Sequence, residues 1–164
     1  MTAGSRRARP EPAEAGEVVV RPGSPSWAGL RFVVIANRCM QPLYGKLERV
    51  HGLARDEAAI LVCLSITTAA TAQAVARYTG RPKNSISRAV GALEDRGLLS
   101  RSAHPVDGRA VCLELTPAGR QAFADISGDH AATDERLLEV LAPDERRRFV
   151  EMLARIAAAS TDWS

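Results

Sequence analysis

The chain has 164 residues, about the length of one domain, which leaves room for a modest hydrophobic core. Hydrophobic residues make up 46% and charged residues 25% of the sequence, as in ordinary globular proteins, and the formal net charge is +3. No apolar run approaches the roughly 20 residues that span a bilayer, and the first residues lack the apolar run of a secretory signal. We therefore expect a cytoplasmic protein with no membrane partner.

The charges are distributed unevenly along the chain. Residues 77–109 contain seven basic and three acidic side chains, a net charge of +4, whereas residues 117–164 contain six basic and nine acidic ones, a net charge of −3. A basic middle followed by an acidic end indicates that one part of the molecule meets a polyanion and another does not. An ordinary solvated surface would give the same asymmetry, so the charge alone does not decide.

The cysteines and histidines predict no chemistry of their own. Cys39, Cys63 and Cys112 are far apart and odd in number, which favours neither a disulfide framework nor a zinc site. Cys63 lies in an apolar run and is expected in the core. No nucleophile–base pair, metal cluster or glycine-rich phosphate loop stands out, so we expect no enzyme, metal or cofactor.

The N-terminal part begins with a tail. Residues 1–26 contain four prolines among glycine, serine and charged side chains, which predicts a disordered segment. Apolar residues at helical spacing then predict a helix over residues 27–51, which Pro42 should kink or interrupt.

Two short helices are expected next. The second helix should cover residues 55–64, because two acidic side chains in its first turn suit a helix N-terminus. Thr71 can cap a third helix over residues 72–79, which Gly80 ends.

The fourth predicted helix, residues 82–96, has two distinct faces. Ile86, Val90 and Leu93 recur at the spacing of one apolar face, and Gly97 is placed to end the helix in a left-handed conformation. The opposite face is polar, small and basic and consists of Lys83, Asn84, Ser87, Arg88 and Gly91.

A hairpin and two further helices complete the chain. Residues 98–101 and 111–115 read as strands around a turn-rich tip, with alternate apolar side chains on one face at Val111, Leu113 and Leu115. Thr116 and Pro117 then read as the cap and first residue of a long helix to about residue 141, and a last helix covers residues 143–160.

Short helices followed by a two-stranded hairpin are typical of a winged helix-turn-helix, so the predicted fold is mainly α with a small β-hairpin wing. The fourth helix suits the major groove of double-stranded DNA, where arginine contacts guanine and asparagine contacts adenine. A winged-helix module that binds protein is the alternative. The predicted DNA contacts are Lys83, Asn84, Ser85, Ser87 and Arg88 on this helix and Arg101, His104 and Arg109 on the hairpin.

Two stretches carry a resemblance to a known family. Residues 83–101, with the run Leu93-Glu94-Asp95-Arg96-Gly97-Leu98, resemble the recognition helix and first wing strand of the multiple-antibiotic-resistance regulator (MarR) family. The wing from Asp107-Gly108-Arg109 to Leu115-Thr116-Pro117-Ala118-Gly119 is similar to that family's Asp-x-Arg and Leu-Thr-x-x-Gly signature. The resemblance covers about residues 27–159, and Arg81 and Pro82 depart from it where the family has an apolar residue and a capping serine.

The resemblance implies a transcription regulator, in most cases a repressor. Residues 27–52 and 117–160 would be dimerisation helices, and residues 53–116 would be the DNA-binding region of a homodimer on a pseudo-palindromic operator. In many members a small, often aromatic effector releases the DNA. The sequence does not identify ligand-binding residues, although His130 on the long helix is a candidate for lining such a pocket.

A thiol-redox-responsive regulator is the alternative mechanism. It would use Cys39, expected at the dimer interface, or Cys112, which alternates with apolar neighbours on its strand and is expected to face outward. A reactive thiol needs both access and a lowered pKa.

Overall fold

The computed structural model describes residues 25, 27–67, 70–103 and 110–160 of the chain. The structure is mainly helical with one two-stranded antiparallel sheet, as predicted. Almost all of the predicted N-terminal tail lies outside the described residues. The elements in chain order are α1 (Ala28–His51), α2 (Arg55–Ser65), α3 (Ala72–Thr79), α4 (Lys83–Asp95), β1 (Leu99–Ala103), β2 (Val111–Leu115), α5 (Pro117–Leu138) and α6 (Pro143–Ser160).

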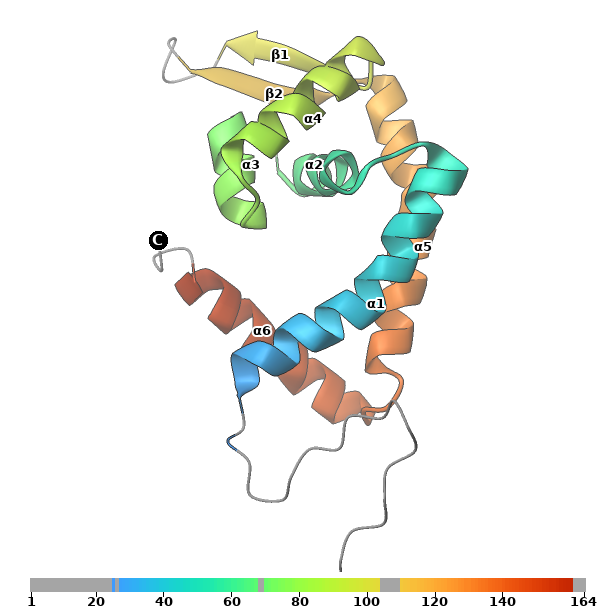
Figure 1. Ribbon diagram of the computed structural model, residues 1–164, viewed down its shortest axis with the longest axis vertical. Helices are drawn as coiled ribbons and strands as arrows, with labels where there is room; N and C mark the ends of the chain where they lie inside the picture. The colour runs from blue at the N-terminus through green and yellow to red at the C-terminus, as the bar shows by residue number, and fades with distance from the viewer. Residues whose placement is uncertain (1–24, 26, 68–69, 104–109, 161–164) are drawn as a thin grey trace, which may run out of the picture.

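The elements form two regions (Figure 1). Helices α2, α3 and α4 and the hairpin pack together with the C-terminal half of α1 and the first half of α5, and we call this region the lobe. Helices α1 and α5 extend from it alongside each other. We call the far end, residues 28–38 and 131–138 together with α6, the arm.

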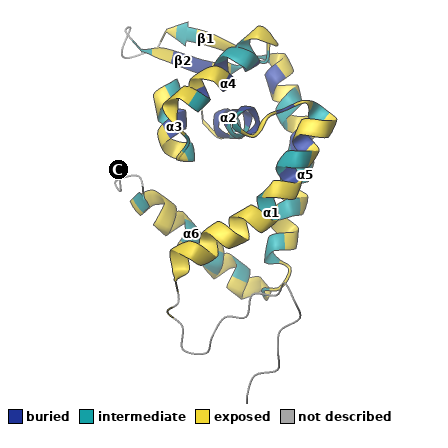
Figure 2. Ribbon diagram, in the orientation of Figure 1, coloured by how far each residue is buried: buried dark blue, intermediate teal, exposed yellow. Residues whose placement is uncertain are grey.

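The hydrophobic core lies in the lobe (Figure 2). Leu43 and Leu47 of α1 and Ile126 of α5 are buried with side chains of α2, α3 and α4, so the core extends beyond residues 53–116. In contrast, α6 contains no buried residue. The arm is therefore held together by half-covered side chains, while the lobe has a closed interior.

Side-chain caps fix the starts of two helices, α3 and α5, where they were predicted. The hydroxyl of Thr71 accepts a hydrogen bond from the backbone N–H of Ala74 at 3.1 Å, and α3 has the predicted bounds. The hydroxyl of Thr116 accepts from the N–H of Gly119 at 3.0 Å at the start of α5. Each bond satisfies an amide that the first helical turn would leave unpaired.

Helix α1 continues through Pro42, so the alternative of an interruption there is wrong. Proline removes one backbone donor and disfavours a helix interior. The adjacent residue Leu43 is only 4% exposed and Leu47 is fully buried in the lobe. Tertiary packing directly after the proline therefore outweighs the lost hydrogen bond.

The wing pairs β1 with β2 in the register Leu99 to Leu115 and Ala103 to Val111. The expectation that Cys112 faces outward is wrong, because its side chain is fully buried. Leu113 is also buried, and its N–H bonds to the carbonyl of Ala70 at 2.8 Å. Successive side chains of a strand point to opposite faces, so both faces of β2 are covered at Cys112 and Leu113. The alternation of residue types along β2 therefore does not mark a solvent-exposed face.

Candidate nucleic-acid interface

Helix α4 is anchored by its predicted apolar face. Ile86 and Leu93 are fully buried and Val90 is 2% exposed. Of the predicted outer face, four side chains are exposed, and they lie in the N-terminal half of the helix: Lys83, Asn84, Ser87 and Arg88. The structure therefore brings a cationic and polar surface together on a helix that the core holds from behind. This arrangement suits contact with the edges of bases in a major groove.

Ser85 lies differently from its neighbours. Its side chain is half-buried, and its hydroxyl donates to one carboxylate oxygen of Asp56 at 2.5 Å. The other oxygen of Asp56 accepts from Nε of Arg81 at 2.5 Å. Above all the Arg81 bond, with help from Ser85, holds the pKa of Asp56 below its usual value, against the effect of burial. The Ser85 hydroxyl is therefore bonded within the protein, and its DNA contact stays a prediction.

A second contact ties α2 to the other end of α4. Nη1 of Arg96, the C-cap residue, donates to the carbonyl of Gly52 at 3.0 Å and lies 3.2 Å from the Glu57 carboxylate. The same carboxylate accepts from the N–H of Ala54 at 2.9 Å. Glu57 thus binds the N–H of Ala54, the N-cap residue of α2, and also pairs with Arg96.

The wing contributes one described candidate. Nε of Arg101 donates to both carboxylate oxygens of Glu94, at 3.1 and 3.0 Å, and both side chains are partly exposed. Exposed ion pairs of this kind contribute little stability, so a phosphate can compete for the arginine. The predicted contacts at His104 and Arg109 lie in the wing tip, outside the described residues.

The junction of the wing and α5 is tightly built. The Thr116 hydroxyl donates to the carbonyl of Gly97 at 2.7 Å, and the Thr116 N–H bonds to the carbonyl of Leu98 at 3.2 Å. A Cβ on Gly119 would lie 1.9 Å from the same Leu98 oxygen. Only glycine fits there, which gives a physical reason for the threonine-to-glycine spacing noted in the sequence.

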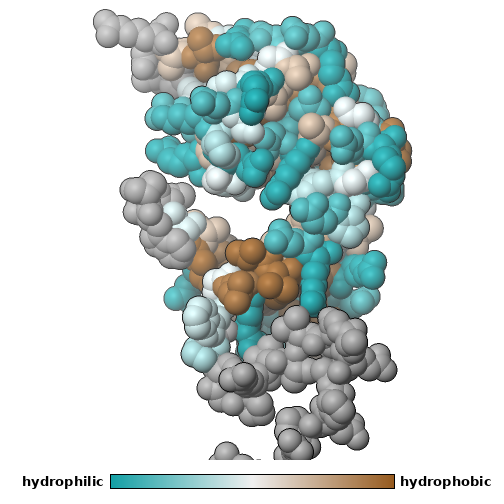
Figure 3. Space-filling model, in the orientation of Figure 1, coloured by the Kyte–Doolittle hydropathy of each residue, from teal (hydrophilic) through white to brown (hydrophobic). Residues whose placement is uncertain are grey.

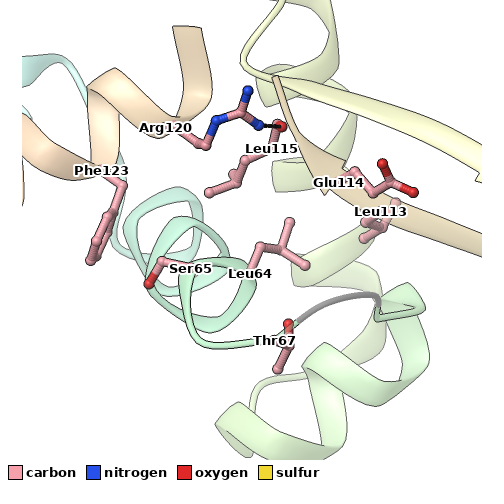
Figure 4. Close-up of a pocket in the computed structure, with 8 residues that line it drawn as sticks. All are labelled: Leu64, Ser65, Thr67, Leu113, Glu114, Leu115, Arg120 and Phe123. Carbon is pink, nitrogen blue, oxygen red and sulfur yellow. Dashed lines mark hydrogen bonds between the residues drawn. The ribbon is translucent and has the colours of Figure 1, made fainter. Parts of the chain in front are cut away.

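A hollow of about 420 Å³ lies beside this junction (Figure 4). Its walls come from the end of α2, from β2 and from the first turns of α5. Arg120 reaches across one wall and donates to the carbonyl of Leu115 at 2.7 Å, and Phe123 forms another wall. A molecule seated in this hollow would contact the wing strand and α5 at once.

The arm has an apolar surface (Figure 3). A hollow of about 560 Å³ is lined by apolar side chains of α1, α5 and α6, among them Ile35, Leu137 and Phe149. Many large apolar side chains of the arm are exposed, namely Leu30, Phe32, Val33, Val34, Ile35, Val150, Met152 and Ile156, and so is Val140 in the link between α5 and α6. Exposed apolar surface of this extent is typical of sites where a protein contacts another apolar surface.

The cysteines and His130 are not arranged as a reactive site. Cys63 is buried as predicted, and burial raises the pKa of its thiol. Cys39 is half-buried and lines the arm hollow. Nε2 of His130 is buried without a hydrogen-bond partner, and desolvation lowers its pKa. In the described part of the chain, no group of three or more His, Cys, Asp or Glu side chains could hold a metal ion.

Two residues at this interface were not among the predicted contacts. In the sequence, Asp56 is one of two acidic residues that suit a helix N-terminus. Arg81 is a departure from the pattern of the MarR family. Because Asp56 and Arg81 are 25 residues apart in the sequence, local spacing gives no signal that they form a pair. The one sequence feature that points to this pair is the position of Arg81, directly before Pro82 at the start of the helix.

The fold and the surface of α4 define a winged-helix DNA-binding protein. Among the described helices, none is both long and apolar enough to cross a membrane. The comparisons with known proteins agree with this class. Residues 51–110 match the MarR family. The regulator MhqR of Bacillus subtilis (strain 168), named an HTH-type transcriptional regulator, is 28% identical over 130 residues, which cover 77% of this chain and 90% of MhqR.

Solved structures establish the same fold. A MarR-family regulator from Silicibacter pomeroyi has a TM-score of 0.73 and 24% identity, covering 81% of this chain and 89% of its own. CouR from Rhodococcus jostii RHA1, solved with p-coumaroyl-CoA, has a TM-score of 0.70 and 22% identity, covering 80% and 92%. The chain thus has the winged helix-turn-helix fold of these regulators, and its residues 51–110 match the MarR family of DNA-binding transcriptional regulators. This agrees with the expectation that it is not an enzyme.

Proposed function

We propose that the chain is a repressor that binds a pseudo-palindromic operator as a homodimer and is released by a small effector. The observation that carries the proposal is the exposed face of α4 with Lys83, Asn84, Ser87 and Arg88, on a helix whose opposite face is buried. In this proposal Arg88 and Asn84 contact bases, and Lys83 contacts phosphate. Arg101, His104 and Arg109 of the wing would contact the flanking backbone or minor groove.

Helices 27–52 and 117–160 would form the dimer. The apolar arm supports this assignment, because its exposed side chains belong to the N-terminal half of α1 and to α6. A two-fold axis through the arm would place two lobes side by side, with one α4 for each half-site. Successive half-sites on one face of DNA are about 34 Å apart, one helical turn.

A small aromatic effector would act within the lobe, where the wing strand β2 meets α5. CouR, solved with the aromatic thioester p-coumaroyl-CoA, is a precedent within this fold. The hollow between α2, β2 and α5 offers the aromatic ring of Phe123 and the cation of Arg120 as a binding surface. An occupant would push β2 away from α5 and change how the wing lies beside α4.

Selection from a random pool of duplex DNA tests the proposal. The purified protein should enrich a two-fold symmetric site, and its affinity for that site should fall steeply as salt rises, since phosphate contacts release counterions. A pool with no enriched sequence after repeated rounds at low salt would contradict operator binding. That outcome would favour the protein-binding alternative for this winged helix.

Arg88→Ala tests the role given to the recognition surface. We expect a loss of about 1–3 kcal/mol in binding to the selected site, together with relaxed preference at one base pair of each half-site. Arg147→Ala is the matched control, because it removes the same charge from an exposed position of α6. An equal loss on all DNA sequences would assign Arg88 to phosphate instead of a base.

A further inference from the structure

The recognition helix α4 starts without a side-chain cap. Pro82 occupies the N-cap position and offers no side-chain acceptor. The N–H groups of Ser85 and Ile86 bond to the carbonyl of Pro82 at 3.0 and 3.1 Å. The place of this first turn relative to the rest of the lobe must therefore be set by contacts with other elements.

Asp56 makes those contacts from the first turn of α2. One carboxylate oxygen accepts from Arg81, directly before Pro82, and the other from Ser85, in the first turn after it. The Asp56 side chain is only 14% exposed, and its lowered pKa keeps it charged at neutral pH. A charge-assisted bond from each side of the helix start resists both sliding and rotation of this turn.

The same turn of α2 also contacts α1 and the far end of α4. The guanidinium of Arg55 lies over the ring of Tyr44 of α1, 4.7 Å from its centre. Glu57 pairs with Arg96 at the C-cap of α4. Three successive residues of α2 thus connect the helix that leads to the arm with both ends of the recognition helix.

We propose that Asp56 is a positioning residue for DNA recognition, which holds Arg81 and Ser85 so that the first turn of α4 presents Lys83, Asn84, Ser87 and Arg88 at a fixed angle. Ser85 then acts within the protein and does not contact DNA. The effect on DNA rests on the proposed function, whereas the effect on the helix start does not.

Asp56→Asn tests the proposal, because it keeps the shape of the side chain and removes its charge. Its affinity for the selected site should fall about tenfold, while binding to a scrambled duplex should not weaken, since the protein has become more positive. Asp95→Asn is the matched control: it makes the same charge change at an exposed position of α4 and should retain the preference for the selected site. Equal discrimination in both variants would overturn the proposal.

A double-mutant cycle separates the role given to Ser85 from a direct DNA contact. If Ser85 acts through Asp56, Ser85→Ala weakens binding in the parent but adds nothing in the Asp56→Asn background. If Ser85 touches DNA, the two backgrounds lose the same factor, and that part of the proposal fails. Thermal unfolding of each variant identifies any that has lost its fold. Arg81→Lys, which weakens the ion pair with Asp56, then takes the place of that variant.

Hydrogen exchange of the DNA-free protein tests the helix start by itself. In Asp56→Asn, the amides of Ser85 and Ile86 should exchange about tenfold faster, because their turn opens more often. The amides of Gly119 and Arg120, in the first turn of α5, should be unchanged. Unchanged exchange at Ser85 and Ile86 would overturn the proposal even if DNA is bound, and faster exchange would support it even if the DNA selection fails.

Discussion

The lobe and the arm contain similar apolar side chains but cover them to different degrees. Ile86 in the lobe is fully buried, whereas Ile35 and Ile156 in the arm are 45% and 44% exposed. Both regions are helical, and both show apolar residues at helical spacing in the sequence. The difference is that the lobe closes its own core, while the arm leaves one apolar face open.

This difference shows what amphipathic spacing can and cannot predict. Apolar residues at helical spacing predict that the apolar face of a helix will be covered, because exposed apolar area is unfavourable in water. The spacing does not state whether the covering surface belongs to the same chain. In the lobe the same chain covers the apolar faces, and in the arm it leaves them exposed. A single substitution in each region can test this difference.

The largest effect is expected in the lobe. Leu93→Ala should lower the free energy of unfolding by about 2–5 kcal/mol, because it removes a fully buried side chain and leaves a cavity. Urea unfolding measures the change, which should not depend on protein concentration. Leu30→Ala, at a position 58% exposed in the arm, is the matched control and should have an effect that does vary with concentration.

Ile35→Asp should break the arm contact. If a second copy covers this face, as in the proposed dimer, a charge placed there should raise the dissociation constant by at least about 100-fold, or about 3 kcal/mol. Light scattering after size-exclusion chromatography would detect the monomer. Val50→Asp, on the same helix but outside the arm, should remain dimeric. Loss of the dimer in both variants, or in neither, would remove the distinction between the two regions.

Gly119→Ala should disturb the contact between the wing and the start of α5, within the lobe. The added Cβ would lie 1.9 Å from the carbonyl oxygen of Leu98, so the start of α5 must move away from the wing. We expect a loss of about 1–3 kcal/mol in stability, as for other overpacked sites. Gly128→Ala, a helical position of α5 with open space, is the control for chemical denaturation. Equal stability of the two variants would show that the close approach is absent in solution.

The smallest effect concerns pH. Burial lowers the pKa of His130, with the carboxylates of Asp134 and Asp129 opposing the shift, so the unfolded chain takes up this proton before the folded protein does. Stability should therefore fall as the pH drops below the usual histidine value of about 6.5. His130→Phe should remove this part of the decline. Parallel melting-temperature curves for the two proteins between pH 7 and 5 would contradict the assignment.

Most of the fold could be predicted because its signals are local. Thr71 and Gly80 fix both ends of α3 within nine residues of each other, and Thr116 marks the start of α5. Local signals fail where distant segments decide. The alternation along β2 suggested one wet face, but packing on both sides buries Cys112.

The recognition face illustrates the same limit within one helix. Ile86 and Leu93 were assigned correctly from spacing alone, and Arg88 lies on the exposed side as expected. Ser85 is half-buried and lies at the edge of the two faces, next to the buried Ile86. Its partner Asp56 is 29 residues away, and no periodicity connects them.

Helix α1 belongs to both regions, and this continuity has a mechanical consequence. Its 24 residues form an unbroken rod of about 36 Å, with the arm at one end and the buried Leu43 and Leu47 toward the other. A tilt of about five degrees at the arm would carry the lobe end sideways by about 3 Å, close to the rise of one base pair. In the proposed dimer, a small rearrangement between the two subunits would thus be magnified into a mismatch with the helical repeat of DNA.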